Sequence, residues 1–327
     1  MKYKINKKTN KKTNKKTITF LLMLFLLLIA CCQDVSVQAT TKKGVRNVSA
    51  KTTDTSSFYR NKQKIYLDSS WKYADHAKIT SGYAVMYTAK KNRKDIVIAV
   101  NAGHGTKGGS SVKTLCHPDG SPKLTGGTTQ AGAIQAVAVS DGMIFRDGTA
   151  ERNVTLRMAK ILKKKLLAEG YDVLMVRDGK DVQLDNVART VICNNVADCH
   201  IALHWDGDGL RYDKGAFAIS VPEGLKKKKP VSSYWEQHEA LGAALVKGLR
   251  SNGVKISGTG ATAIDLTQTS HSTIPSVDME LGNQCSDHSD RKLEVLADGL
   301  VQGINKYVKK HIKIAPLRDY KKNGGSK

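Results

Sequence analysis

Residues 96–105 read IVIAVNAGHG, and this stretch indicates the fold more directly than any other. Five consecutive apolar residues are typical of a strand covered on both faces, and the glycines that follow favour a sharp turn. His104 stands in this turn, where the strand ends of an open α/β sheet gather functional groups. Glycines also mark ordinary turns, so His104 alone is equally compatible with a turn residue that has no chemical task. A phosphate-binding loop is not indicated, because the pattern GxxxxGKS/T is absent.

Strands and helices alternate along the chain on both sides of this stretch. Further apolar runs predict strands at residues 173–176, 201–203, 216–221 and 276–281. Apolar residues at three- and four-residue steps predict helices at 151–169, 233–252 and 287–308. We therefore expect an α/β fold, a single-domain three-layer sandwich whose mixed, mostly parallel central sheet carries helices on both faces.

The amino-terminal residues are typical of an export signal. Residues 1–16 contain eight lysines and no acid, and an apolar run at 18–30 follows that is short for a permanent membrane span. We predict a signal sequence at 1–30 and a flexible tether at 31–65, which is rich in Ser, Thr, Lys and Asn. A folded domain at 66–313 and a basic tail at 314–327 complete the chain.

Two cleavage sites compete at the end of the signal. Residues 28–31 (LIAC) resemble a lipoprotein signal, in which Cys31 would be acylated, whereas residues 37–39 (VQA) resemble an ordinary small-residue site. A retained membrane anchor is a third alternative. All three place the folded domain outside the cytoplasm, either secreted or anchored at the outer face of the membrane.

The chain is strongly basic, with a formal net charge of +24. Residues 1–30 hold eight lysines and no acid, so the remainder still carries +16. A surface this basic attracts polyanions such as teichoic acids or anionic lipid headgroups, although a solvated basic surface without a specific partner is the plainer interpretation. We expect no nucleic-acid binding, because helix-turn-helix patterns, zinc-finger spacings and basic motifs with interleaved aromatic residues are absent.

Three further side chains stand out beside His104. His204 ends an apolar strand just before the turn at 205–209. Glu151 opens a predicted helix, where a carboxylate is also common as a partner of the helix dipole. Glu280 stands in an apolar strand, where an unpaired carboxylate is costly to bury, so a structural ion pair with an arginine is its plainer interpretation.

Taken together, these residues have the composition of a catalytic zinc site. His104, Glu151 and His204 supply two imidazoles and one carboxylate, a set that leaves a fourth zinc position open for water. Glu280 adds the carboxylate that such chemistry needs for proton transfer. The pattern HExxH is absent, so the usual metalloprotease helix is not expected.

Other histidines and cysteines carry no predicted role. His200 shares its side of the strand with His204 but lies about 13 Å away along it, too far for one metal ion, and is expected to be a core histidine. Cys116, Cys193, Cys199 and Cys285 form no CxxC pair, so a thiolate zinc site is not indicated, and we assign no disulfide pairing.

The order of the motifs resembles the zinc-dependent N-acetylmuramoyl-L-alanine amidases of bacterial cell walls. The resemblance covers residues 95–308 and rests on IVIAVNAGHG, ERN at 151–153, GYDVLMVRDG, VQLDNVARTVICNN, ADCHIALHWD and IPSVDMELGN. It implies a Zn²⁺ ion bound by His104, Glu151 and His204, with Glu280 as the catalytic carboxylate. It also implies cleavage of the peptidoglycan amide between the lactyl group of N-acetylmuramic acid and L-alanine. We expect Arg177 and Arg189 to be structural ion-pair partners.

The sequence departs from that family in two places. Asn101 and Ala102 stand where the family usually has Asp-Pro or Asp-Ala, which predicts a weaker contact to the zinc-binding histidine. The segment 107–150 is longer than the family's common connection, so we expect it to cover the cleft or select substrates. The alternative functions are a zinc peptidase acting elsewhere on the stem peptide and a non-catalytic wall-binding module, and the presence of all four site residues argues against the second.

Overall fold

The computed structural model describes residues 59–312, all within one compact unit of the chain, residues 54–327. The predicted signal, residues 31–58 of the predicted tether and the predicted basic tail lie outside the described residues. The first strand, β1 (Gln63–Ile65), pairs with β2 (Ala84–Tyr87), and Ile65 is buried in the core. The fold therefore begins before the boundary that we placed at residue 66. Over residues 59–312, no helix has the length and apolar character needed to cross a membrane.

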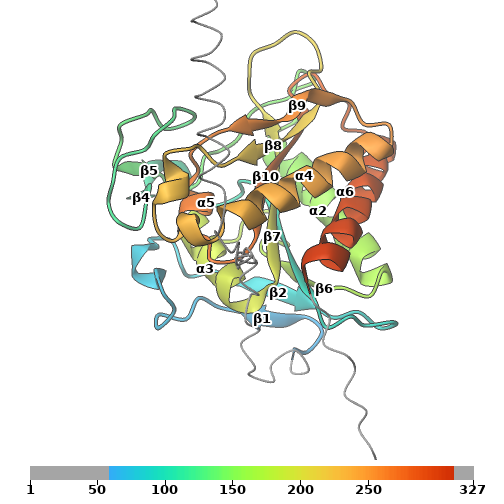
Figure 1. Ribbon diagram of the computed structural model, residues 1–327, viewed down its shortest axis with the longest axis horizontal. Coiled ribbons are helices and arrows are strands. Elements are labelled where there is room, and N and C mark those ends of the chain that lie inside the picture. Colours follow the sequence, from blue (N-terminus) through green and yellow to red (C-terminus); the bar gives the residue numbers. More distant parts are fainter. Residues whose placement is uncertain (1–58, 313–327) are drawn as a thin grey trace, which may run out of the picture. The chain divides into compact units, whose positions relative to one another are not determined.

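A mixed sheet of eight strands forms the centre of this unit, in the order β1-β2-β6-β3-β7-β10-β8-β9 (Figure 1). Its four middle strands run parallel to one another. They are β6 (Asp172–Met175), β3 (Val97–Ala102), β7 (Cys199–Asp206) and β10 (Ser276–Asn283). β2 and β8 (Ala216–Ser220) flank them as antiparallel neighbours, and β9 (Ile256–Ala263) is the outermost strand on the β8 side. β3 is buried along its whole length, as its apolar run predicts.

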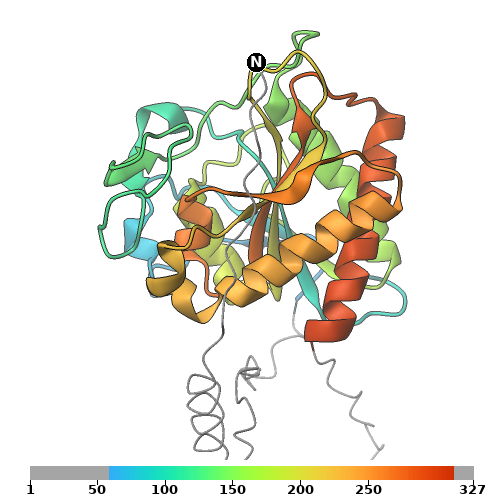
Figure 2. The same cartoon turned by 45° about the horizontal axis from the view of Figure 1, so that its top comes forward.

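Helices cover both faces of the sheet, which confirms the predicted three-layer α/β architecture. The larger layer contains α2 (Glu151–Ala168), α4 (Trp235–Ser251) and α6 (Asp290–His311), which pack on one another and on the sheet (Figure 1). In Figure 2, the orange α4 and the red α6 cross in front of this face. The opposite layer contains α3 (Asn186–Val196) and the short α5 (Thr267–His271). Two apolar cores result, one on each face.

Local sequence explains where α2 begins and ends, and this helix positions one of the predicted site residues. Val154, Met158, Leu162 and Leu166 recur every four residues and are fully buried. Gly170 follows the helix with a φ of +90°, and a side chain there would collide with the backbone oxygen of Asn92. The helix therefore presents its first residue, Glu151, at the same end of the sheet as the carboxyl end of β3.

The segment between β3 and α2, residues 107–150, forms a small structure of its own beside the main sheet. Its strands β4 (Lys113–Leu115) and β5 (Gln135–Val137) pair with each other in an antiparallel hairpin. A buried ion pair ties it to the rest of the fold, because His117 Nε2 lies 2.9 Å from Asp265 Oδ2, just before α5. Figures 1 and 2 show this segment in teal and green, projecting from one side of the sheet.

Candidate metal centre

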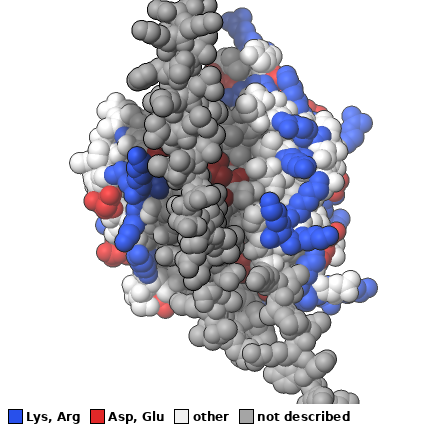
Figure 3. All heavy atoms as spheres, in the orientation of Figure 1, with Lys and Arg blue, Asp and Glu red and all other residues white. Residues whose placement is uncertain are grey.

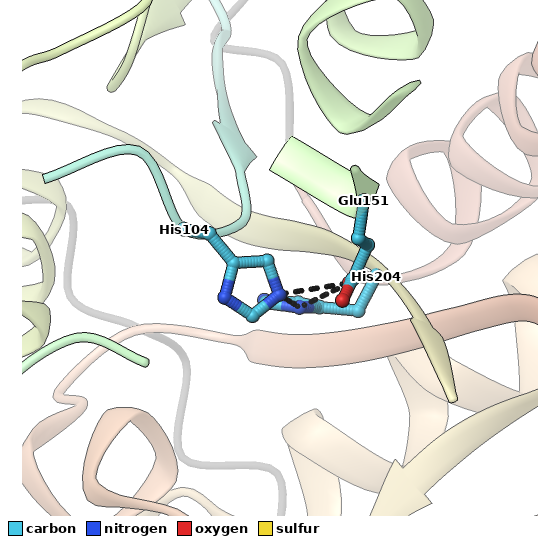
Figure 4. Close-up of side chains that lie close together, drawn as sticks. All are labelled: His104, Glu151 and His204. Atoms are coloured by element: carbon cyan, nitrogen blue, oxygen red, sulfur yellow. Dashed lines mark hydrogen bonds and ion pairs between the residues drawn. The ribbon is translucent and has the colours of Figure 1, made fainter. Parts of the chain in front are cut away.

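Three of the predicted site residues converge at the carboxyl ends of the parallel strands. His104 lies in the turn after β3, His204 lies near the end of β7, and Glu151 is the first residue of α2. Figure 4 shows the three side chains pointing toward one another. Glu151 and His104 are buried, and His204 keeps a side-chain exposure of 20%.

One donor atom of each residue lies close to those of the other two. His104 Nε2 is 2.8 Å from Glu151 Oε1, and His204 Nδ1 is 3.0 Å from His104 Nε2 and 3.1 Å from Glu151 Oε1. Ligands about 2.0–2.1 Å from one tetrahedral zinc ion are separated by about 3.3 Å. The donor set and its spacing therefore fit a divalent metal with minor adjustment. Among residues 59–312, this is the one group of three such side chains close enough to share an ion.

Hydrogen bonds from the surrounding chain fix the orientation of these donors. His104 Nδ1 lies 2.8 Å from the backbone oxygen of Ser140, so Nδ1 carries the proton and the Nε2 lone pair faces the cluster. The Glu151 carboxylate accepts backbone N–H bonds from Trp205 to Oε1, at 3.0 Å, and from Met143 to Oε2, at 2.9 Å. Ser140 and Met143 belong to the segment 107–150, which therefore supports the cluster directly.

Two glycines allow this close approach. A side chain at Gly103 would place its Cβ 2.2 Å from the ring of His204, and one at Gly142 would lie 2.8 Å from the ring of His104. His104 itself adopts a φ of +63°, a left-handed conformation that is uncommon for a residue other than glycine. Such backbone strain is concentrated at functional sites.

The electrostatics of the cluster follow from its geometry. Burial disfavours the charged form of Glu151, but the facing imidazoles of His104 and His204 outweigh burial and lower its pKa. Burial likewise disfavours the charged form of His204, but Asp278 and Glu151 raise its pKa to about 10. The three residues therefore favour a positive charge between them, and a bound cation can provide that charge.

Glu280 faces the same cleft from the neighbouring strand. In the parallel pairing of β10 with β7, Glu280 is the direct partner of His204. Its Oε2 is buried without a hydrogen-bond partner, and no ion pair involves it within the described part of the chain. The alternative of a structural ion pair with an arginine is therefore wrong. Burial raises the pKa of Glu280 well above its usual value, and the nearby Asp278 raises it further.

Asp278 is a site residue that the sequence analysis missed. It precedes Glu280 by two residues, so the alternation of a strand places both on the same face. Its Oδ2 lies 3.7 Å from His204 Nε2, and its Oδ1 is buried without a partner among the described residues. The sequence did indicate Asp278 as a candidate. A carboxylate in an apolar strand is costly to bury, and this holds for Asp278 as it does for Glu280.

These residues line a cleft of about 780 Å³. The segment 107–150 forms one wall, with Ser110, Lys123, residues 126–129, Ala136, Val137 and residues 140–143. The segment therefore lies beside the cleft. On the face drawn in Figure 3, acidic side chains appear near the middle, with lysines and arginines along its sides. Asp206 and Asp208, near His204, each pair with Lys214.

The expected roles of Arg177 and Arg189 need correction. Both are fully buried, yet neither has a carboxylate within ion-pairing distance among the described residues. Arg177 donates to the backbone oxygens of Ala102 and Gly103, and Arg189 donates to that of His104 at 2.8 Å. Burial lowers their pKa values to about 10 and about 9 respectively. The two guanidinium groups thus hold the turn that carries His104.

The departure at Asn101 has a different consequence from the one expected. Asn101 Oδ1 accepts from Arg189 Nη1 at 3.2 Å, so it supports the arginine rather than the histidine. The contact to His104 Nδ1 comes from Ser140 instead. Outside the cluster, His200 is a buried core histidine as predicted, and Cys116, Cys193, Cys199 and Cys285 are free thiols.

The fold and the site together define an α/β enzyme with a two-histidine, one-carboxylate cluster of the kind that serves metal-dependent hydrolysis. Comparison with known protein families identifies the enzyme family to which the chain belongs. The sequence pattern of the N-acetylmuramoyl-L-alanine amidase family matches residues 98–310, and the chain belongs to that family. It is therefore an amidase, and its substrate is the peptidoglycan of the cell wall. The resemblance seen in the sequence is confirmed.

Solved structures show the same fold. The N-acetylmuramyl-L-alanine amidase Ami1 from Mycobacterium smegmatis is 16% identical and superposes with a TM-score of 0.55 over 66% of this chain and 97% of its own. The apo form of Ami1 from Mycobacterium abscessus is 20% identical, with a TM-score of 0.51 over 65% and 98% of the two chains. No curated protein sequence matches the chain significantly.

Proposed function

We propose that this amidase is zinc-dependent and cleaves the bond between the lactyl group of N-acetylmuramic acid and L-alanine. His104, Glu151 and His204 hold the zinc, and Glu280 is the catalytic carboxylate. The observation that carries the proposal is the convergence of three donor atoms within 2.8–3.1 Å of one another, beside the Glu280 carboxylate, whose buried Oε2 has no hydrogen-bond partner among the described residues. Family membership supports the choice of bond.

The donor set favours zinc among the divalent metals. Two imidazoles and a carboxylate with an open fourth position are typical of catalytic zinc, whereas calcium and magnesium prefer all-oxygen sites. The Ser140 oxygen holds His104 in the tautomer that a metal requires, and Trp205 and Met143 hold the Glu151 carboxylate. The site therefore needs little rearrangement to bind the ion.

The remaining steps are assigned to side chains of the cleft. When bound, zinc polarises a scissile carbonyl and lowers the pKa of water toward about 7. Glu280 lies on the strand beside His204, so its carboxylate can accept the proton of the attacking water and pass it to the departing amine of L-alanine. The wall formed by residues 107–150 restricts access to this edge of the sheet and positions the stem peptide.

We further propose that the enzyme works outside the cytoplasm. The support is the sequence of residues 1–30 and the location of peptidoglycan itself. The basic residues beyond the signal attract anionic wall polymers or the membrane surface, which would concentrate the enzyme near its substrate.

Product analysis tests the proposed function. Purified peptidoglycan is digested with the zinc-loaded protein, and the new termini are identified by mass spectrometry, with Glu280→Gln as the matched inactive control. A free amino group on L-alanine together with a free lactyl carboxylate supports the proposal. New termini elsewhere in the stem peptide would make the protein a zinc peptidase, and unchanged peptidoglycan would favour a wall-binding module.

A further inference from the structure

We infer that Asp278 is the positioning residue for the zinc ligand His204, an inference that rests on the proposed zinc site. His204 directs Nδ1 toward His104 and Glu151, so this nitrogen must present its lone pair to a metal. The proton of the neutral imidazole then resides on Nε2. Asp278 Oδ2 faces that nitrogen at 3.7 Å.

The surroundings of His204 offer Nε2 no better partner. Within residues 59–312, the contacts of its ring nitrogens are those of Nδ1 to the cluster and that of Nε2 to Asp278. At 3.7 Å the two atoms are just beyond hydrogen-bond distance, and a bridging water or a small rotation of the carboxylate would connect them by hydrogen bonds. A carboxylate beside the distal nitrogen of a ligating imidazole fixes the tautomer and makes the ring a stronger ligand.

The strand register explains why Asp278 reaches this position. Ala202 is its direct partner on β7, two residues before His204, so the alternation of the paired strands places Asp278 on the same face of the sheet as His204. On the opposite side of β10, Val277, Met279 and Leu281 are buried in the apolar core.

Asp278 occupies a different position in the site from the two nearby carboxylates, Glu151 and Glu280. Glu151 contributes Oε1 to the cluster itself, and Glu280 is the direct strand partner of His204. Asp278 precedes Glu280 by two residues in β10, and its side chain is 12% exposed. A buried carboxylate with an unpartnered oxygen destabilises a fold unless another group uses its charge. The Nε2–H group of His204 is the group that this arrangement provides.

Zinc affinity is the direct test. The dissociation constant for zinc is measured by chelator competition on the purified full chain and on Asp278→Asn, which keeps the shape of the side chain but removes its charge. We expect affinity to fall about 10–100-fold, the usual effect of removing such a partner. Turnover on peptidoglycan at saturating zinc should change much less, because Asp278 acts through His204 rather than on the substrate.

Asp206→Asn is the matched control, because it removes the same charge from the same cleft at a side chain that pairs with Lys214. The zinc affinity of Asp206→Asn should stay within about threefold of the parent's. This result would show that the contact of Asp278 with His204, rather than the total negative charge of the cleft, determines zinc affinity. Asp278→Ser provides a second variant if Asp278→Asn does not fold, as judged by the unfolding transition of the metal-free protein.

The outcomes separate this inference from the proposed function. If the parent binds zinc and Asp278→Asn binds it as tightly, Asp278 is not a positioning residue, while the zinc site stands. A large loss of turnover at saturating zinc without loss of affinity would also overturn the inference and place Asp278 on the substrate. If the parent binds no zinc, both the site and the role of Asp278 are wrong.

Discussion

The imidazole of His104 is hydrogen-bonded through Nδ1 to the backbone oxygen of Ser140, 2.8 Å away. Ser140 Oγ lies 3.1 Å from the same nitrogen. The residue that supports this ligand therefore comes from the segment 107–150, which also forms a wall of the cleft. The proposed metal site and access to the cleft are thus structurally linked.

The first prediction separates Glu280 from the ligands. Glu280→Gln keeps the shape of the side chain and its capacity for hydrogen bonds but removes the group that carries a proton. Turnover should fall by about two orders of magnitude or more, while the zinc content stays near that of the parent. Steady-state digestion of peptidoglycan and metal analysis measure the two effects. Loss of zinc would make Glu280 a ligand, and unchanged turnover would move the catalytic carboxylate elsewhere.

The second prediction concerns the metal. The purified protein should carry about one zinc, and His204→Ala should lose most of it together with its activity. His200→Asn is the control, because His200 lies on the same side of β7 at its buried end and outside the cluster. Metal analysis after extensive chelation, followed by readdition of zinc, measures the dependence. Full activity of metal-free protein would contradict the zinc proposal.

A third prediction tests the role assigned to the buried arginines. Arg189→Met removes five hydrogen bonds to buried oxygen atoms around the His104 turn. Each acceptor left without a partner costs about 1–3 kcal/mol, so the free energy of unfolding should fall by about 3 kcal/mol or more. Denaturant titration measures this loss. Arg211→Met, at an exposed position, should change the free energy of unfolding by less than about 0.5 kcal/mol.

The fourth prediction is a pH dependence of stability. His238 is buried on α4, where its Nδ1 accepts from the backbone of Ser276, and burial lowers its pKa from 6.5 to about 3. Between these two values the unfolded chain binds a proton that the folded protein does not. This contribution to stability is therefore complete above pH 6.5 and is lost as the pH falls toward about 3.

The variant His238→Gln isolates that contribution. One such histidine adds up to about 1.4 kcal/mol per pH unit to the slope of the unfolding free energy. The variant should flatten this slope between pH 6.5 and pH 4, as measured by denaturant titration at several pH values. His311→Gln, exposed at the end of α6, should change the slope much less. Equal slopes for the parent and His238→Gln would show that His238 is not buried in its neutral form.

The fifth prediction concerns export and rests on the sequence alone. If the lipoprotein site is used, Cys31→Ala should release the protein from membranes or leave an unprocessed precursor. Cell fractionation and intact-mass measurement distinguish these forms. A mature protein that begins at Thr40, with a mass unchanged by Cys31→Ala, would favour the ordinary signal site instead.

The sequence predicted the central strands and the large helices because their signals are local. The continuous apolar run before His104 and the four-residue spacing in α2 are both visible in short windows. The helix α3 was not predicted, because its buried face includes Arg189, Thr190 and Cys193 and its apolar pattern is weak. The hairpin of β4 and β5 was missed because each strand has only three residues.

The site was predictable to the extent that single residues carried a chemical signal. His104, Glu151, His204 and Glu280 were identified by residue type and position, and the structure brings all four to one cleft. The contact of Ser140 with His104 depends on how a long segment folds back, which no local pattern specifies. The approach of Asp278 to His204 depends on the register of two strands that are about 75 residues apart in the chain.

The alternation of β10 also limits how this protein can be altered. Asp278 and Glu280 face the cleft, while Val277, Met279 and Leu281 face the core. Insertion or deletion of a single residue within the strand would exchange the two faces, because the side-chain period of a strand is two. Such a change would bury two carboxylates and expose the apolar residues at once. A change of chain length by one residue within this strand would therefore disrupt the cleft and the core together.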